Sequence, residues 1–187
     1  MKVLEALQMV HAISKSSQEL IAELIVEKSY KKGEHLLEIG QIDKQVHFIV
    51  KGSGRVYYLH KGLDVTDYIA MDGQFLGGVS SVFTGMQSHK AIELTEDSII
   101  ESVKQKDLEE LSLKHHEIET LYRKLMTWAF LECQARIEDI RFMSAAERYH
   151  ALEAKYPGVS NRIPLKFLAS YLGTTQVSLS RIRAGKQ

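Results

Sequence analysis

The 187-residue sequence has only one cysteine and no long run of apolar residues. Its one cysteine, Cys133, excludes an internal disulfide, a thiolate zinc site and an iron–sulfur cluster held by a single chain. The uninterrupted apolar runs are only a few residues long, as at Phe48 to Val50, and the N-terminus has no processing pattern. We therefore expect a cytoplasmic protein without a membrane partner.

The motifs of common catalytic and metal centres are also missing. The sequence has no P-loop, no Gly-x-Ser-x-Gly elbow and no Gly-x-Gly-x-x-Gly turn. Its eight histidines include no His-Glu-x-x-His pair, and adjacent His115 and His116 diverge around a helix rather than chelate together. We therefore predict no enzyme activity, no metal site and no cofactor.

The charges are balanced overall but segregated along the chain. Lysine and arginine number 24, as do aspartate and glutamate, so the net charge is zero. Residues 141–187 hold eight of the basic residues against two glutamates, which leaves 16 basic and 22 acidic residues in the first 140. A basic terminal module on an acidic body favours contact with a polyanion, although such an excess also occurs on ordinary surfaces.

The hydrophobic pattern changes from helix to strand near residue 30. Ser16 and Glu19 have capping-box spacing ahead of helically spaced leucines and isoleucines, so we expect a helix that ends near Lys28. Short apolar runs separated by glycine-containing breaks then follow, as at Lys61-Gly62 and Asp72-Gly73. They predict a compact antiparallel barrel or roll with strands at 46–50, 55–59, 65–71, 91–94 and 99–103.

A long helix is expected after Asp107. An apolar or small residue recurs every three or four positions along it, and a helix of about 30 residues spans about 45 Å, more than a small domain needs. The stripe either lies across the chain's own β domain or forms a seam between two chains, and we predict the dimer seam. A capping box at Ser144 and Glu147 ends this helix near Met143, and Pro157-Gly158 ends the next one. The stripe consists of Ile118, Leu121, Leu125, Ala129, Cys133, Ile137 and Ile140.

The stretch from Pro164 to Arg183 predicts two short helices joined by a tight turn. Pro164 suits a first helical position, Gly173 a left-handed turn, and Thr175 the N-cap of the second helix. Small Ala169 allows a close crossing, which indicates a helix-turn-helix; an ordinary helical hairpin is the alternative. The second helix would expose side chains to base edges and phosphates. The expected DNA contacts are Thr175, Gln176, Ser178, Arg181, Arg183, Lys166 and Lys186.

This order of elements resembles the Crp/Fnr family of bacterial transcription regulators. The segments that carry the resemblance are 49–56, 74–77 and 169–182, while Ser144–Tyr149 with Pro157 and Ile163-Pro164 looks like the short branch common in Bacteroidetes. The resemblance implies an α+β fold with a jelly-roll-like β-roll sensor domain over 1–110, a dimerisation helix over 111–143 and a helix-turn-helix domain over 144–187.

The resemblance also implies partners. It leads us to expect a homodimer that binds double-stranded DNA, answers to an unidentified small-molecule effector and contacts RNA polymerase. Many relatives continue past the reading helix into a β-hairpin wing, and we expect none here because the sequence ends at Gln187.

The roll departs from the family members that bind cyclic nucleotides. Those members place a glutamate for the ribose hydroxyl and, about ten residues later, an arginine for the phosphate; Gly78 and Ser88 stand at these positions. A lost charge-assisted bond costs about 1.5 to 3 kcal/mol, which is at least tenfold in affinity. We therefore expect no response to cyclic AMP and an effector pocket of unknown specificity around Gly77, Gly78, Ser88 and His89. The alternative is a small-ligand or cyclic-nucleotide module whose last helices no longer read DNA.

Overall fold

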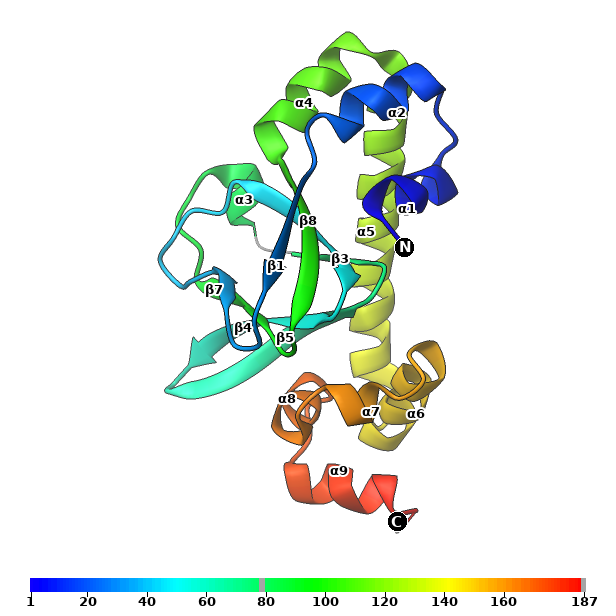
Figure 1. The fold of residues 1–187 in the computed structure, drawn as a ribbon. Helices are drawn as coiled ribbons and strands as arrows, with labels where there is room; N and C mark the ends of the chain where they lie inside the picture. Colours follow the sequence, from blue (N-terminus) through cyan, green and yellow to red (C-terminus); the bar gives the residue numbers. More distant parts are fainter. Residues whose placement is uncertain (78–79, 186–187) are drawn as a thin grey trace.

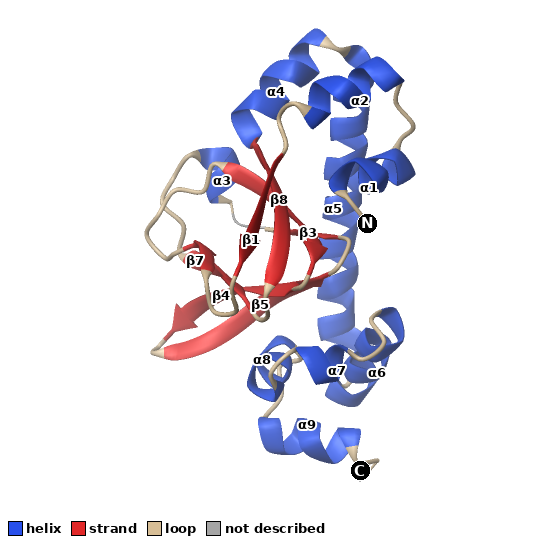
Figure 2. Cartoon of the chain, in the orientation of Figure 1, coloured by secondary structure: helices blue, strands red, loops and turns tan. Residues whose placement is uncertain are grey.

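The computed structural model describes residues 1–77 and 80–185, so residues 78–79 and 186–187 lie outside the description. In the described residues, eight strands form two four-stranded antiparallel sheets, ordered β1-β8-β3-β6 and β2-β7-β4-β5. Figure 2 shows the strands gathered into a roll. They are β1 (Val26–Tyr30), β2 (His35–Leu37), β3 (Gln45–Lys51), β4 (Ser53–His60), β5 (Leu63–Met71), β6 (Gln74–Leu76), β7 (Lys90–Leu94) and β8 (Ser98–Lys104).

The expected α+β architecture is confirmed, and so are its five expected strands, which are β3, β4, β5, β7 and β8. The missed strands β2 and β6 have three residues each, and β1 has mostly exposed, polar residues. Gly62 and Gly73 turn the chain with positive φ, as expected. At Gly52, φ is 115° and a Cβ would lie 2.1 Å from Ser98 Oγ, so only glycine fits this turn.

Apolar side chains from both sheets meet inside the roll. Ile49, Val56, Ile92, Leu94 and Ile100 are fully buried there. They alternate with outward-facing residues along their strands, which is the pattern that a two-layered β structure buries. This core is closed without help from the long helix.

Helices pack at both ends of a long helix that runs along one side of the roll (Figure 1). The helices of the described residues are α1 (Val3–Val10), α2 (Lys15–Ala22), α3 (Ser81–Thr84), α4 (Gln105–Lys114), α5 (His116–Phe142), α6 (Ala145–Lys155), α7 (Val159–Arg162), α8 (Leu165–Tyr171) and α9 (Gln176–Arg183), of which α5 is the long one and α3 lies on the roll (Figure 1). Helices α1, α2 and α4 lie near the start of α5, and α6 to α9 lie at its other end. In the described residues, no helix combines the length and the apolar character that a membrane span requires.

The helix expected before Lys28 is α2, and it begins and ends earlier than expected. Ser14, not Ser16, is the N-cap of α2 and accepts a hydrogen bond from Ser17 N at 3.3 Å. The helix ends at Ala22 rather than near Lys28, because residues 26–30 pair with β8 as strand β1. The expected capping box was therefore wrong because Ser14 caps the helix, and the expected end was wrong because pairing at the sheet edge outweighed the local helical pattern.

Three of the seven residues expected in the dimer seam are buried within their own chain. Ile118, Leu121 and Leu125 are 0, 3 and 7% exposed, and they pack against apolar residues of α1, α2 and β3 in the same chain. These side chains are unavailable to a partner. Ala129 is half-buried, whereas Cys133, Ile137 and Ile140 further along α5 are exposed.

The ends of the last helices follow the expected signals. Ser144 and Glu147 form the capping box that starts α6, and α6 ends two residues before Pro157. The long helix α5 ends at Phe142, close to the expected Met143, but it begins only at His116 because His115 has an extended backbone. The expected single helix from residue 111 is thus the end of α4 followed by α5.

Candidate nucleic-acid interface

Helices α8 and α9 are joined by a tight turn that the sequence chemistry explains. The N–H of Leu172 closes the last turn of α8, Gly173 has φ 63°, and Thr174 N donates to Ala169 O at 2.9 Å. Thr175 then caps α9, because its hydroxyl accepts a hydrogen bond from Ser178 N at 3.1 Å. The two expected helices are confirmed, with Pro164 at the N-cap of α8, one position before its expected place.

The inner faces of α8 and α9 share a core with α6. Leu168, Ala169, Leu172 and Leu179 are at most 2% exposed, and Tyr149 belongs to the same cluster. Arg148 of α6 donates to Leu172 O at 2.7 Å, which ties α6 to the turn. This packing leaves only one side of α9 open.

The open side of α9 carries the residues expected to contact DNA. Gln176, Ser178, Arg181 and Arg183 are exposed, and α9 contains no acidic residue. Among the described residues, no carboxylate pairs with either arginine. The Thr175 hydroxyl also donates to Ser178 Oγ at 3.0 Å, so both hydroxyls help to define the start of the helix.

Two further cations were expected beside this helix. Lys166 is exposed on α8, and its Nζ lies 4.6 Å from the centre of the Phe167 ring. Lys186 lies outside the described residues. The expected cationic rim is therefore described only at Lys166 and Arg183.

Part of the basic excess in residues 141–187 is used inside the molecule. Arg148 donates to the carbonyls of Met143 and Leu172, and Lys155 pairs with Glu132 of α5 at 2.9 Å. Arg162 is occupied by the roll, as described below. Arg181 and Arg183 of α9 are among the basic residues of this segment that stay exposed and could contact a polyanion.

The expected effector pocket is split between buried and exposed residues. Ser88 is buried, and its hydroxyl donates to Lys90 O at 2.8 Å and accepts from Lys90 N at 3.0 Å. His89 is exposed, Gly77 is half-buried, and Gly78 lies outside the described residues. Ser88 therefore stabilises its own loop, and its hydroxyl is not free for a phosphate.

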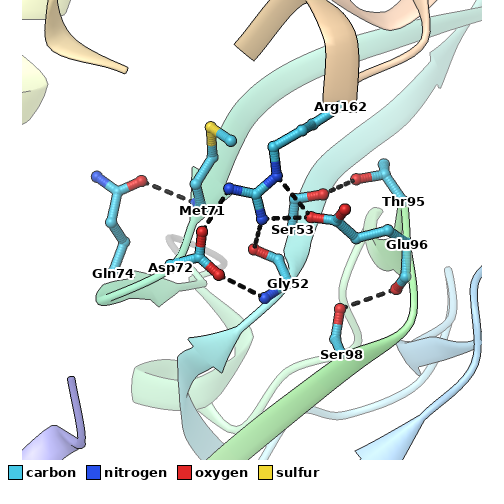
Figure 3. Close-up of polar contacts among 9 residues, drawn as sticks. All are labelled: Gly52, Ser53, Met71, Asp72, Gln74, Thr95, Glu96, Ser98 and Arg162. Carbon is cyan, nitrogen blue, oxygen red and sulfur yellow. Dashed lines mark hydrogen bonds and ion pairs between the residues drawn. The ribbon is translucent and has the colours of Figure 1, made fainter. Parts of the chain in front are cut away.

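Sequence reasoning missed the residue that attaches the last helices to the roll. Arg162, at the end of α7, reaches three turns of the roll at once (Figure 3). Its guanidinium pairs with Asp72, donates to Glu96 Oε1 at 2.5 and 3.1 Å, and donates to Gly52 O at 3.0 Å. We call this cluster of Arg162, Asp72, Glu96 and Gly52 the Arg162 hub.

The hub sets the ionisation of its carboxylate. Partial burial by itself raises the pKa of Asp72, but hydrogen bonds from Arg162 and from Gly52 N outweigh it and lower the pKa below its ordinary value. Asp72 is thus held as a carboxylate between the roll and α7. No sequence signal marked Arg162, because its three partners are up to 110 residues away in the chain.

A second contact joins β4 and β5 to α8. Arg55 is 3% exposed and bonds Asp64 at 2.5 and 2.7 Å and Glu93 at 2.8 Å. Its guanidinium lies 3.5 Å from the centre of the Phe167 ring, and Thr66 N donates to Ser170 Oγ at 2.8 Å. Helix α8, the first of the two helices, is therefore fastened directly to the roll.

Comparisons with known proteins identify the roll and the overall fold. Residues 27–115 match the family model of the cyclic nucleotide-binding domain. FixK2 from Bradyrhizobium japonicum is 18% identical, with 86% of this chain and 83% of that chain covered and a TM-score of 0.73. A putative Crp/Fnr family transcriptional regulator from Eubacterium rectale is 16% identical, with coverages of 97% and 87% and a TM-score of 0.70.

The Thermus thermophilus catabolite activator protein is a further similar structure. It is 17% identical, with coverages of 96% and 85% and a TM-score of 0.57. No curated protein sequence matches the chain. Residues 27–115 therefore match a cyclic nucleotide-binding domain, and the chain has the fold of Crp/Fnr family transcription regulators, as the resemblance in its sequence led us to expect.

Proposed function

We propose that this protein is a DNA-binding transcription regulator of the Crp/Fnr type. The observation that carries the proposal is the open side of α9, which is cationic, lacks acidic residues and lies at the end of the molecule away from the roll (Figure 1). A short helix presented in this way by a preceding helix and a tight turn can enter a major groove.

The side chains of α9 suggest separate roles. Gln176 can pair with adenine and Arg181 with guanine, because both offer bidentate hydrogen bonds. Val177 is exposed and offers only apolar contact, such as with a thymine methyl. Arg183, Lys166 and Lys186 are assigned to phosphates, which position the helix without reading the sequence.

We further propose a homodimer formed through the distal part of α5. Phe130, Cys133, Ile137 and Ile140 repeat at intervals of three and four along this helix, and all four are exposed. An exposed apolar stripe of this kind is covered favourably by a second copy. A two-fold dimer would place its two α9 helices on half-sites centred about 34 to 36 Å apart.

The effector is proposed not to be cyclic AMP. Neither Gly78 nor Ser88 offers a carboxylate or a guanidinium, and the Ser88 hydroxyl is already bonded to the backbone of Lys90. We expect titration calorimetry at physiological salt to detect weak or no binding of cyclic AMP. Micromolar or tighter binding would contradict this part of the proposal and support the alternative of a cyclic-nucleotide module with a degenerate DNA-binding region.

DNA binding is tested by selecting bound duplexes from random DNA and then measuring affinity by fluorescence anisotropy across a salt series. Arg181→Ala should cost about 1 to 3 kcal/mol on the selected duplex and relax the choice at one base pair. The matched variant Lys186→Ala should weaken all duplexes alike and reduce the salt slope by about one.

Two outcomes would count against these roles. Equal losses on selected and scrambled duplexes for Arg181→Ala would reject base reading by this residue. A wild-type protein that binds no duplex at low salt would overturn the regulator proposal and leave the ligand-binding module.

A further inference from the structure

A cavity of about 340 Å³ lies where the roll meets the last helices. Its walls come from β5, from the distal part of α5, and from α6 and α8. Its volume falls within the range of small-molecule sites, and such sites form preferentially where two structural units meet. It is separate from the pocket expected around Ser88 and His89, which are not among its lining residues.

Several tyrosine rings contribute to the wall of this cavity. Tyr68 of β5, Tyr156 after α6 and Tyr171 of α8 all line it. Within the described part of the chain, the hydroxyls of Tyr68 and Tyr171 have no hydrogen-bond partner, whereas Tyr156 accepts from Gln74 Nε2. Burial raises the pKa of Tyr68 to about 12, so near neutral pH its hydroxyl is a proton donor rather than an anion.

A guanidinium lies beside the same rings. The centre of the Arg136 guanidinium is 5.2 Å from the Tyr68 ring centre and 5.9 Å from that of Tyr171. Its Nη2 donates to Asp67 O and lies 3.8 Å from the carboxylate oxygen Asp67 Oδ1, which leaves Nη1 and Nε for a ligand. A planar guanidinium next to phenolic donors is suited to a carboxylate, which accepts two parallel bonds.

The other two cations of the cavity are already bonded within the protein, which leaves Arg136 as the cation for a ligand. Arg148 and Lys155 also line the cavity, but Arg148 is bonded to two carbonyl oxygens and Lys155 to Glu132. The carboxylates of Asp67, Glu132 and Asp139 balance the three cations in number. A nucleotide with several phosphate charges would meet these acids, whereas a monoanion needs only Arg136.

We propose that this cavity binds a small aromatic carboxylate, with its ring among Tyr68, Tyr156 and Tyr171 and its carboxylate on Arg136. Because β5 belongs to the roll and Tyr171 belongs to α8, the ligand would touch both the roll and the proposed DNA-reading unit. The binding itself does not depend on the proposed function, so it is measured without DNA.

The chemical test compares matched probes on the full chain by saturation-transfer NMR and titration calorimetry. The aromatic carboxylates are benzoate, 4-hydroxybenzoate, 2-naphthoate and indole-3-acetate. Cyclohexanecarboxylate retains the charge without the aromatic ring, and benzyl alcohol retains the ring without the charge. We expect at least one aromatic carboxylate to bind tenfold or more tightly than both controls. If none of the four binds at millimolar concentration, or if the controls bind equally, the proposal is overturned.

The location is tested with variants of α5. Arg136→Gln should weaken the best probe about tenfold or more, because a charge-assisted bond is lost. Arg123→Gln is the matched control, since Arg123 is exposed and pairs with Glu119 of the same helix at 3.4 Å. Ala135→Phe, at an exposed position on the cavity wall, should block the site without disturbing the core. Unchanged binding in both Arg136→Gln and Ala135→Phe would place the probe elsewhere and overturn the proposal.

Discussion

The roll is joined to helices in two places, and the two junctions differ in chemistry. Near the start of α5, Leu121 and Leu125 pack with Val3, Ile21 and Phe48 in an apolar core. At the other end, α7 and α8 are held by the Arg162 hub, by the contact of Arg55 with the Phe167 ring, and by Ile69 and Met71 of β5, which are buried in the core of the last helices.

The difference shows which junction is permanent. Separating the apolar junction would expose several buried side chains to water, at about 1.5 to 3 kcal/mol each. The carboxylate of Asp72 is 43% exposed, so water can replace much of what its partner Arg162 provides. We therefore infer that the apolar junction stays closed in the folded protein. The junction at α7 and α8 is the one whose contacts are able to change. Leu125→Glu and Arg162→Met test the two junctions, and Ile137→Glu tests the exposed part of α5.

The largest effect is expected at the apolar junction. Leu125→Glu places a carboxylate in a site that is 7% exposed, and it should destabilise the fold by about 3 to 5 kcal/mol. The matched control is Leu113→Glu, at a residue of α4 that is 83% exposed, which should change stability by less than about 0.5 kcal/mol. Urea unfolding followed by circular dichroism measures both. A stable, folded Leu125→Glu protein would show that this junction is not apolar and closed.

A smaller effect on folding, but a clear one on assembly, is expected on the distal part of α5. Ile137→Glu should leave the monomer folded and raise the dimer dissociation constant at least tenfold, because a charge would enter the proposed seam. Leu131→Glu makes the same change at another exposed position of α5 and should leave the dimer intact. Sedimentation measures both variants, and oxidation of Cys133 to a covalent dimer gives a second readout. A monomeric wild type at tens of micromolar would contradict the dimer.

The smallest effect is expected at the Arg162 hub. Arg162→Met should lower stability by about 1 to 2 kcal/mol, discounted because both carboxylate partners are partly exposed. The control is Arg141→Met, at an exposed arginine near the end of α5. Faster proteolysis of the segment that links the roll to α7, with the roll itself left intact, would support the distinction between the two junctions. A loss as large as that of Leu125→Glu would remove the distinction between the junctions.

The hub also predicts a pH dependence. The pKa of Asp72 is lowered in the folded state, so its contribution is present above its ordinary pKa near 4 and is lost as the pH falls through the lowered value. The stability difference between wild type and Arg162→Met should therefore shrink as the pH falls below about 4. Urea unfolding at fixed pH values in this range checks the sign, and a difference that grows on acidification would reject it.

Local signals in the sequence were reliable where they involve one residue and its near neighbours. The capping box at Ser144, the left-handed turn at Gly173 and the cap at Thr175 are all present, because each depends on hydrogen bonds a few residues apart. Local signals did not predict strand β1, because its conformation comes from pairing with β8, more than 65 residues away.

The periodicity of α5 shows the same limit for packing. One apolar stripe runs through Leu125 and Ile137, yet the first is buried by α1 and β3 while the second is exposed. The periodicity shows that one face of the helix is apolar, but it does not show whether the same chain or a second chain covers that face. The same holds for charge, since Arg162 and Arg183 are equivalent in a composition count but only Arg162 meets carboxylates.

The sequence by itself determined the order of helix, roll, long helix and paired short helices, because hydrophobic period and turn chemistry are local properties. It also led us to predict, from the family resemblance, that Gly78 and Ser88 stand where cyclic-nucleotide-binding relatives have charged groups. Only the tertiary structure decided that Leu125 faces its own chain, that Arg162 and Arg55 fasten the last helices to the roll, and that a tyrosine-lined cavity remains between them. These features join residues far apart in the chain, and their energies depend on burial that no local pattern contains.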